Sequence, residues 1–75
     1  MVIDLIVHVT DDGYTAEIPS LKGCETWAHT EDDSIEKAIE LLKYYIGLPD
    51  ESKIIVDRAR KGKTKTVYKL VFDKE

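Results

Sequence analysis

The chain has 75 residues, of which 43% are hydrophobic and 35% are charged, with a formal net charge of −4. This length fits one domain with a small core, and no apolar run approaches the roughly 20 residues of a transmembrane helix. We expect no secretory signal before the first strand. The single cysteine, Cys24, excludes an internal disulfide framework and favours a reducing, cytoplasmic setting.

The first elements in chain order are two strands joined by a turn. Residues 2–10 are rich in β-branched side chains, which favour a strand. Residues 11–13 predict a turn, in which Gly13 is free to take a positive φ. Residues 14–18 alternate between apolar and polar side chains, as a half-buried strand does. We therefore predict an antiparallel hairpin.

A loop and a short third strand follow the hairpin. Pro19 ends the second strand because it has no amide hydrogen to donate to a neighbouring strand. The chain must then swing into residues 24–28, the predicted third strand. We predict a positive φ at Gly23 in this loop, because glycine adopts that conformation without steric cost.

A helix over residues 31–46 is the clearest element of the sequence. Thr30 and Asp33 resemble a capping box, and acidic residues fill the first turn, where the helix dipole favours them. Gly47 suits the C-terminal cap, and Pro49 prevents continuation. Apolar side chains recur at helical spacing at Ile35, Ala38, Ile39, Leu42, Tyr45 and Ile46.

Residues 50–61 are compatible with two structures. Pro49, the basic residues before Gly62 and Gly62 itself favour a short second helix, whereas the β-branched run 54–56 favours a strand. We predict the helix and keep the strand as the alternative. Residues 65–72 alternate and predict a final strand.

The element order β-β-β-α-(α)-β predicts an α+β fold in one domain, residues 1–75. We expect a two-layer sandwich in which a mostly antiparallel sheet carries one main helix on one face. Strand alternation places under the helix Ile3, Leu5, Val7, Val9, Tyr14, Ala16, Ile18, Cys24, Thr26, Tyr68, Leu70 and Phe72. Full burial is predicted for Leu5, Tyr14, Ile18, Ile39, Leu42 and Leu70. The opposite sheet face remains open.

The open face is the candidate partner interface. Trp27 is its most informative residue, because tryptophan is enriched at interface hot spots and an exposed apolar patch marks a contact site. The alternative is that Trp27 folds over an edge and is partly covered by its own chain, and that the histidines are ordinary surface residues. The candidate interface residues are Ile6, His8, Trp27, Val67 and Val71.

Charge is unevenly distributed along the chain. Residues 1–52 carry three lysines against twelve acidic residues, a net charge of −9, which favours a basic partner. Residues 53–75 carry eight basic against three acidic residues, a net charge of +5. Such a basic run is usually a solvated face, but it also offers a possible nucleic-acid contact through Arg58, Arg60, Lys61 and Lys63.

The sequence contains no enzyme signature, and we expect neither a catalytic site nor a cofactor. Cys24 with His8 and His29 could be imagined as a nucleophile or zinc site, but strand alternation turns both histidines away from Cys24. A two-metal carboxylate site is a remote alternative, for which the candidates are Asp4, Asp11, Asp12 and Glu17.

The segment 12–26, with Thr30 and the following helix, resembles the HicB antitoxin family. That family has the pattern D-G-Y-x-A-x-(V/I)-P-x-L-P-G-C-x-T, then G-(D/E)-T and a helix, and the resemblance covers residues 2–46. The residues that carry it are Gly13, Tyr14, Pro19, Leu21, Gly23, Cys24 and Thr30. The sequence departs from the pattern at Lys22, Ala28, His29 and Ser34, and it ends without the C-terminal DNA-binding domain of many family members.

The resemblance implies a single HicB-like domain with a partial ribonuclease-H-like sheet and helix. Its implied role is to bind and mask a small basic HicA-type RNA-cleaving toxin. The residues themselves lead us to expect no catalysis, no cofactor and no membrane contact. A homodimer with Trp27 in or beside the interface is expected, because two-fold dimers are the commonest assemblies. The alternative function is a homo-oligomeric regulator that contacts nucleic acid through residues 58–65.

Overall fold

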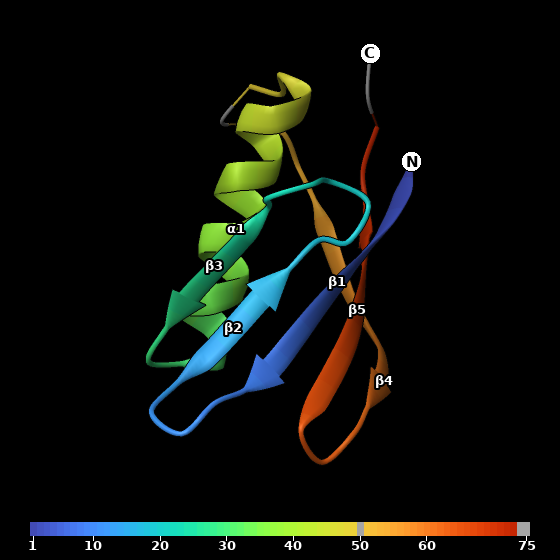
Figure 1. Cartoon of the computed structure of the whole chain (residues 1–75). Helices are drawn as coiled ribbons and strands as arrows, with labels where there is room; N and C mark the ends of the chain where they lie inside the picture. Colours follow the sequence, from blue (N-terminus) through green and yellow to red (C-terminus); the bar gives the residue numbers. More distant parts are fainter. Residues whose placement is uncertain (50, 74–75) are drawn as a thin grey trace.

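A computed structural model describes residues 1–49 and 51–73, and within them the chain forms an α+β fold (Figure 1). One antiparallel sheet has the strand order β3-β2-β1-β5-β4. No helix in these residues is long and apolar enough to cross a membrane. The elements are β1 (Val2–Val9), β2 (Tyr14–Glu17), β3 (Glu25–Ala28), α1 (Glu31–Ile46), β4 (Ile55–Lys61) and β5 (Lys65–Val71).

The predicted helix and its caps are confirmed. The Asp33 amide donates a hydrogen bond to Thr30 Oγ1 over 3.1 Å, so the threonine satisfies one of the amides that a helix N-terminus leaves free. At the other end, Gly47 has a left-handed φ of 73°, and its amide donates to the carbonyl of Lys43.

The second helix predicted in residues 50–61 is wrong, because residues 55–61 form the edge strand β4. Residue 50 lies outside the described residues. β4 pairs with β5 in a register that sets Val56 opposite Leu70, with an irregularity between Arg58 and Arg60. A short helix is stable only if it buries an apolar face. This segment has apolar residues mainly at its start, so pairing with the edge of β5 stabilises it better.

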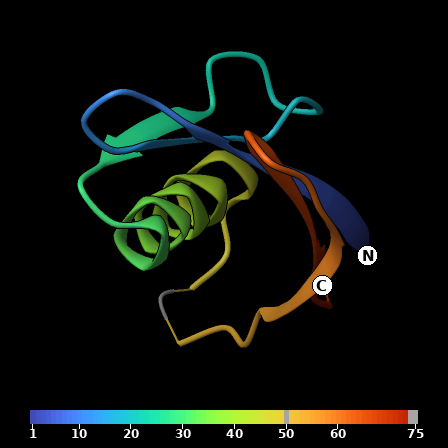
Figure 2. The same ribbon diagram turned by 90° about the horizontal axis from the view of Figure 1, so that it is seen from below.

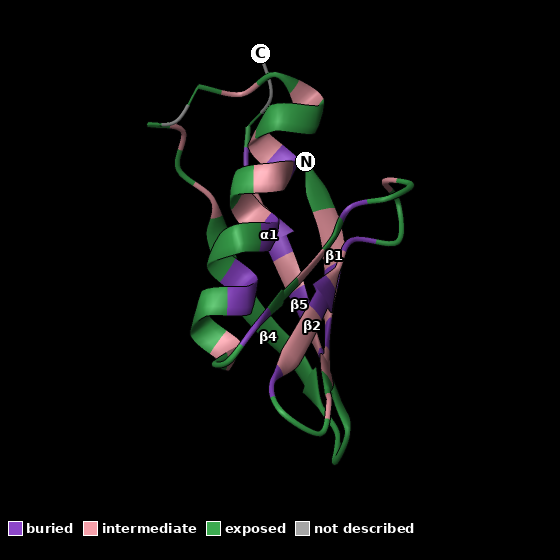
Figure 3. Cartoon of the chain, turned by 60° about the vertical axis from the view of Figure 1, so that its left-hand side comes forward, coloured by how far each residue is buried: buried purple, intermediate pink, exposed green. Residues whose placement is uncertain are grey.

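The core lies between α1 and the sheet. α1 packs over β3 and β2 and more lightly over β1, and the sheet curves around it (Figure 2). We call the sheet face toward α1 the inner face, on which the buried residues gather along β1, β2 and β5 (Figure 3). The buried core comprises Leu5, Val7, Ala16, Ile18, Cys24, Ile35, Ala38, Leu42, Tyr68, Leu70 and Phe72.

Most of the predicted core is confirmed, and some of the predicted residues are less buried than expected. Tyr14 and Ile39 are only half-buried against the core. Val9 is 52% exposed, because it is the last residue of β1, next to the turn. Thr26 is also half-buried, and its hydroxyl donates to the carbonyl of Ser34 in α1 over 3.0 Å.

Gly23 and Gly13 are required for different structural reasons. Gly23 has a φ of 82°, which confirms the prediction for the loop before β3. Gly13 does not adopt the positive φ that its turn would allow, since Gly23 and Gly47 are the positive-φ glycines of the described residues. A Cβ on Gly13 would lie 2.4 Å from the carbonyl oxygen of Ala28 and 2.6 Å from Cζ2 of Trp27. Gly13 is therefore required for close packing.

Candidate partner-binding face

The sheet face turned away from α1, here called the outer face, carries side chains in rows set by the strand register. At the end nearest the N-terminus, Val71 pairs with Val2 on one side and with Ile55 on the other. These three residues form the apolar row. Val2 and Ile55 are 62% and 59% exposed, so the row offers apolar surface across β1, β5 and β4.

A charged row separates the apolar row from the centre of the outer face. Lys69 pairs in register with both Asp4 and Asp57, and its ammonium group donates to Asp4 Oδ1. Both partners of the Lys69–Asp4 ion pair are partly exposed, and such pairs contribute little to stability.

The centre of the outer face is an apolar pair flanked by charges. Ile6 of β1 lies opposite Val67 of β5, and both are half-buried. Glu17 lies on the β2 side of Ile6, and Arg60 lies on the β4 side of Val67. The central pair therefore has an acidic neighbour on one side and a basic neighbour on the other.

The last row, here called the aromatic–basic row, crosses four strands. Trp27 pairs with Thr15, Thr15 with His8, and His8 with Lys65. His8 Nε2 lies 2.9 Å from Glu17 Oε1, so the histidine is hydrogen-bonded to the nearest carboxylate of the central row.

Trp27 folds over the β1–β2 turn and still keeps 40% of its surface exposed. Its indole nitrogen donates to Thr10 Oγ1 over 3.3 Å, and its ring packs against Gly13. The ring of His29 meets it nearly at a right angle, with 4.7 Å between centroids. These contacts hold the indole in one place on the outer face.

The structure brings together some predicted interface residues and separates others. Ile6 and Val67 are direct partners, and His8 and Trp27 share a row, but Lys69 lies between Val67 and Val71 along β5. Because a helix is predicted over residues 50–61, Ile55 is absent from the predicted interface, although it completes the apolar row. The β-branched run 54–56 is the sequence signal that could have placed it there.

The basic residues 58–65 lie in the hairpin of β4 and β5, and every residue of β4 is exposed. Arg60 pairs with Val67 and therefore lies on the outer face. Arg58 and Lys61 pair with the inner-face residues Tyr68 and Thr66, whereas Lys63 is in the turn. The four candidate nucleic-acid contacts thus point in different directions.

The inner face contains two groups with shifted pKa values. Burial raises the pKa of the Tyr68 phenol, the charge of Glu31 and its hydrogen bond add to this, and Arg58 opposes it. Burial also raises the pKa of the Cys24 thiol, which keeps it protonated and unreactive.

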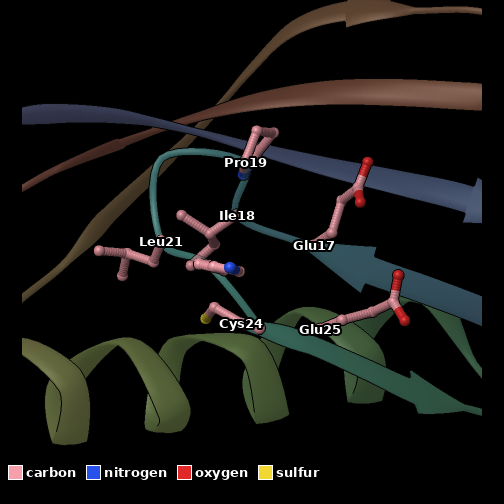
Figure 4. A pocket seen from close by; sticks show the side chains of 8 residues that line it. Glu17, Ile18, Pro19, Leu21, Cys24 and Glu25 are labelled. Carbon is pink, nitrogen blue, oxygen red and sulfur yellow. The ribbon is translucent and has the colours of Figure 1, made fainter.

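The loop between β2 and β3 borders a surface hollow of about 270 Å³. The thiol of Cys24 lies beside α1, whereas the carboxylates of Glu17 and Glu25 point away from the helix (Figure 4). Glu17 and Glu25 are register partners. Within residues 1–49 and 51–73, no three His, Cys, Asp or Glu side chains are grouped as a metal ion would require.

Comparison of the chain with protein-family models, curated proteins and solved structures finds no match. The function is therefore inferred from the residues of this chain and from their arrangement. The outer face provides that arrangement, with an apolar row at one end and an aromatic–basic row at the other.

Proposed function

We propose that the protein is a non-catalytic protein-binding module of the HicB antitoxin type, which acts in the cytoplasm. Its partner would be a small basic HicA-type RNA-cleaving toxin. The observation that carries this proposal is the outer face, where the apolar row and the Ile6–Val67 pair leave apolar surface uncovered by α1. Exposed apolar patches rimmed by polar groups are typical of protein interfaces.

The charge distribution supports a basic partner. Residues 1–52 have a net charge of −9, and acidic side chains gather in the first turn of α1 at Glu31, Asp32 and Asp33. Complementary charge accelerates association and disfavours wrong partners, while apolar contacts supply the affinity. We therefore expect the toxin to associate more slowly at high salt.

The first test is a growth-rescue assay with the toxin partner. The gene adjacent to that of this protein should encode a small basic protein with a catalytic histidine, whose induction arrests growth. Co-expression of the wild-type chain should restore growth, and a Val2→Ser, Ile55→Ser double variant should not. Tyr44→Ser is the matched control, because Tyr44 is 83% exposed on α1, away from the outer face. Equal rescue by all three proteins would refute the proposed interface.

In the absence of a toxin, we propose that two copies associate through the apolar row as a homodimer. Trp27 lies apart from this row, since its own row meets β1 at His8, whereas the apolar row meets β1 at Val2. Sedimentation equilibrium should show a dimer that the Val2→Ser, Ile55→Ser variant dissociates. A wild-type monomer at high micromolar concentration would contradict this proposal. A dimer that only Trp27→Ala dissociates would also contradict it, and would show that the contact lies at the Trp27 end of the outer face.

The second candidate function is nucleic-acid contact through the β4–β5 hairpin. The exposure of all of β4 favours it, because Arg58, Arg60 and Lys61 are accessible to a polyanion.

A further inference from the structure

We propose that the aromatic–basic end of the outer face binds single-stranded nucleic acid, with bases against Trp27 and phosphates against Lys65 and Arg60. This site is separate from the apolar row, and it does not depend on the protein-binding function. It differs from the hairpin contact described above, because it uses Arg60 and Lys65 but neither Arg58 nor Lys61.

The strand register aligns the residues of the site. Trp27, Thr15, His8 and Lys65 are successive partners across β3, β2, β1 and β5. Three spacings between neighbouring strands, about 14 Å in all, separate the backbone of Trp27 from that of Lys65. The row therefore has an aromatic ring at one end and a cation at the other, on one face of a sheet.

Trp27 is suited to stacking against a base. Its ring is held by Gly13 and by the hydrogen bond to Thr10, and it remains 40% exposed. Aromatic side chains on sheet faces stack on bases of any identity, and basic side chains beside them follow the backbone. Because the indole is already fixed in the free protein, little conformational entropy is lost when a base stacks on it.

The cations of the site lie on the β5 and β4 side. Lys65 is exposed beside His8, and Arg60 lies on the same face, opposite Val67. The residue across from Lys65 in the hairpin is Gly62, whose amide donates to the carbonyl of Lys65 over 2.7 Å. Since Gly62 has no side chain, nothing from that residue covers the lysine.

Acidic groups determine the orientation of the ligand. Glu17 is hydrogen-bonded to His8, and its register partner Glu25 lies on β3. Asp11 and Asp12 are in the turn between Thr10 and Gly13, two residues that the indole contacts. These carboxylates repel phosphates from the β2–β3 half of the face, so bases face Trp27 and the backbone follows Lys65 and Arg60. They also limit the affinity, whereas the contacts of Lys65 and Arg60 with phosphates make the binding sensitive to salt.

The same cations could attract an acidic peptide, but the shared row with Trp27 favours nucleic acid. An acidic peptide would use the charges of the whole hairpin and would gain little from an indole that projects from a strand three spacings away from Lys65. Nucleic acid uses both ends of the row, because each nucleotide carries a phosphate and a stacking base.

The test measures binding of a fluorescein-labelled single-stranded uridine decamer by anisotropy at low salt. Titration with unlabelled decamer should quench the emission of Trp27, the chain's one tryptophan. Trp27→Ala should weaken binding about fivefold or more, and Trp27→Phe should restore most of it. Far-UV circular dichroism of each variant confirms that it is folded.

Two matched pairs of charge variants test the face itself. Arg60→Ala and Lys65→Ala, on the outer face, should each weaken binding and reduce the slope of log affinity against log salt by about 0.7. Arg58→Ala and Lys61→Ala remove the same charges from the inner face and should leave binding nearly unchanged. Equal losses for all four variants would overturn the proposed site in favour of general charge attraction.

Three other outcomes would also overturn the proposal. They are absence of binding by the wild type, binding without quenching of Trp27, and equally tight binding of polyglutamate or of a duplex. Binding of a thymidine decamer as well as the uridine decamer would support it, because the two share phosphates and stacking bases. The growth-rescue assay uses variants in the apolar row, so the two proposals can fail separately.

Discussion

Substitution of Gly13 by alanine should destabilise the domain through a single added methyl group. The new Cβ would lie 2.4 Å from the Ala28 carbonyl oxygen and 2.6 Å from Trp27 Cζ2. The second distance is roughly 1 Å shorter than an ordinary carbon–carbon contact. Overpacking of this kind costs about 1–3 kcal/mol, which is a large part of the stability of a small domain. In a chain of this length it lowers Tm by about 5–20 °C.

The indole of Trp27 should move away from the turn, because the backbone of Ala28, which is paired with β2, is less free to shift than a side chain. Its hydrogen bond to Thr10 would then lengthen or break. Tryptophan emission should shift to longer wavelength in Gly13→Ala, and thermal unfolding should give the lower Tm. Gly23→Ala is the control. Its positive φ strains the alanine backbone, but the new Cβ would lie 3.4 Å from the nearest atom, the Tyr45 hydroxyl oxygen, and would not touch Trp27. This substitution should lower Tm without changing the emission. Wild-type emission and Tm in Gly13→Ala would refute the packing argument.

Three further predictions concern the core, the β2–β3 loop and pH. Leu42→Ala should cost about 2–5 kcal/mol in urea unfolding, because Leu42 is fully buried, and a loss below ~1 kcal/mol would contradict its place in the core. Gly23→Val should destabilise more than Lys22→Val, the neighbouring exposed position, since only Gly23 has a positive φ; equal unfolding midpoints would contradict this. Burial, helped by Glu31, raises the pKa of Tyr68, so its contribution to stability is complete below about pH 10 and is lost as pH rises through the raised value. Denaturant unfolding of wild type and Tyr68→Phe should therefore diverge above pH 10, and parallel pH profiles would count against this.

Local signals were sufficient for the elements whose residues interact with near neighbours in sequence. The helix Glu31–Ile46 was predictable from Thr30, Gly47 and an apolar stripe, all within one segment. The β1–β2 hairpin was predictable for the same reason, because a turn and two flanking strands are adjacent. The conformation of Gly13 was not predictable, because its neighbour Trp27 arrives from a different strand.

The strand β4 could not be distinguished from a helix by local signals. Its charged residues, Pro49 before it and Gly62 after it are compatible with both structures. The deciding interaction is pairing with β5, whose free edge would otherwise leave backbone groups unpaired. Once paired, β4 becomes the new edge, and charged side chains with a bulge are the features by which edge strands resist further pairing.

The rows of the outer face depend on register between distant parts of the chain. Alternation within β1 correctly assigns Val2 and Ile6 to one face, but Val2 acquires its apolar neighbours only through Val71 and Ile55. A shift of one residue in β5 would turn all of its side chains to the other face and would bury Lys69. The inner-face residues Tyr68 and Leu70 prevent that shift, because their burial fixes the register of β5. The packing that stabilises the core therefore also determines which side chains meet on the face proposed to bind partners.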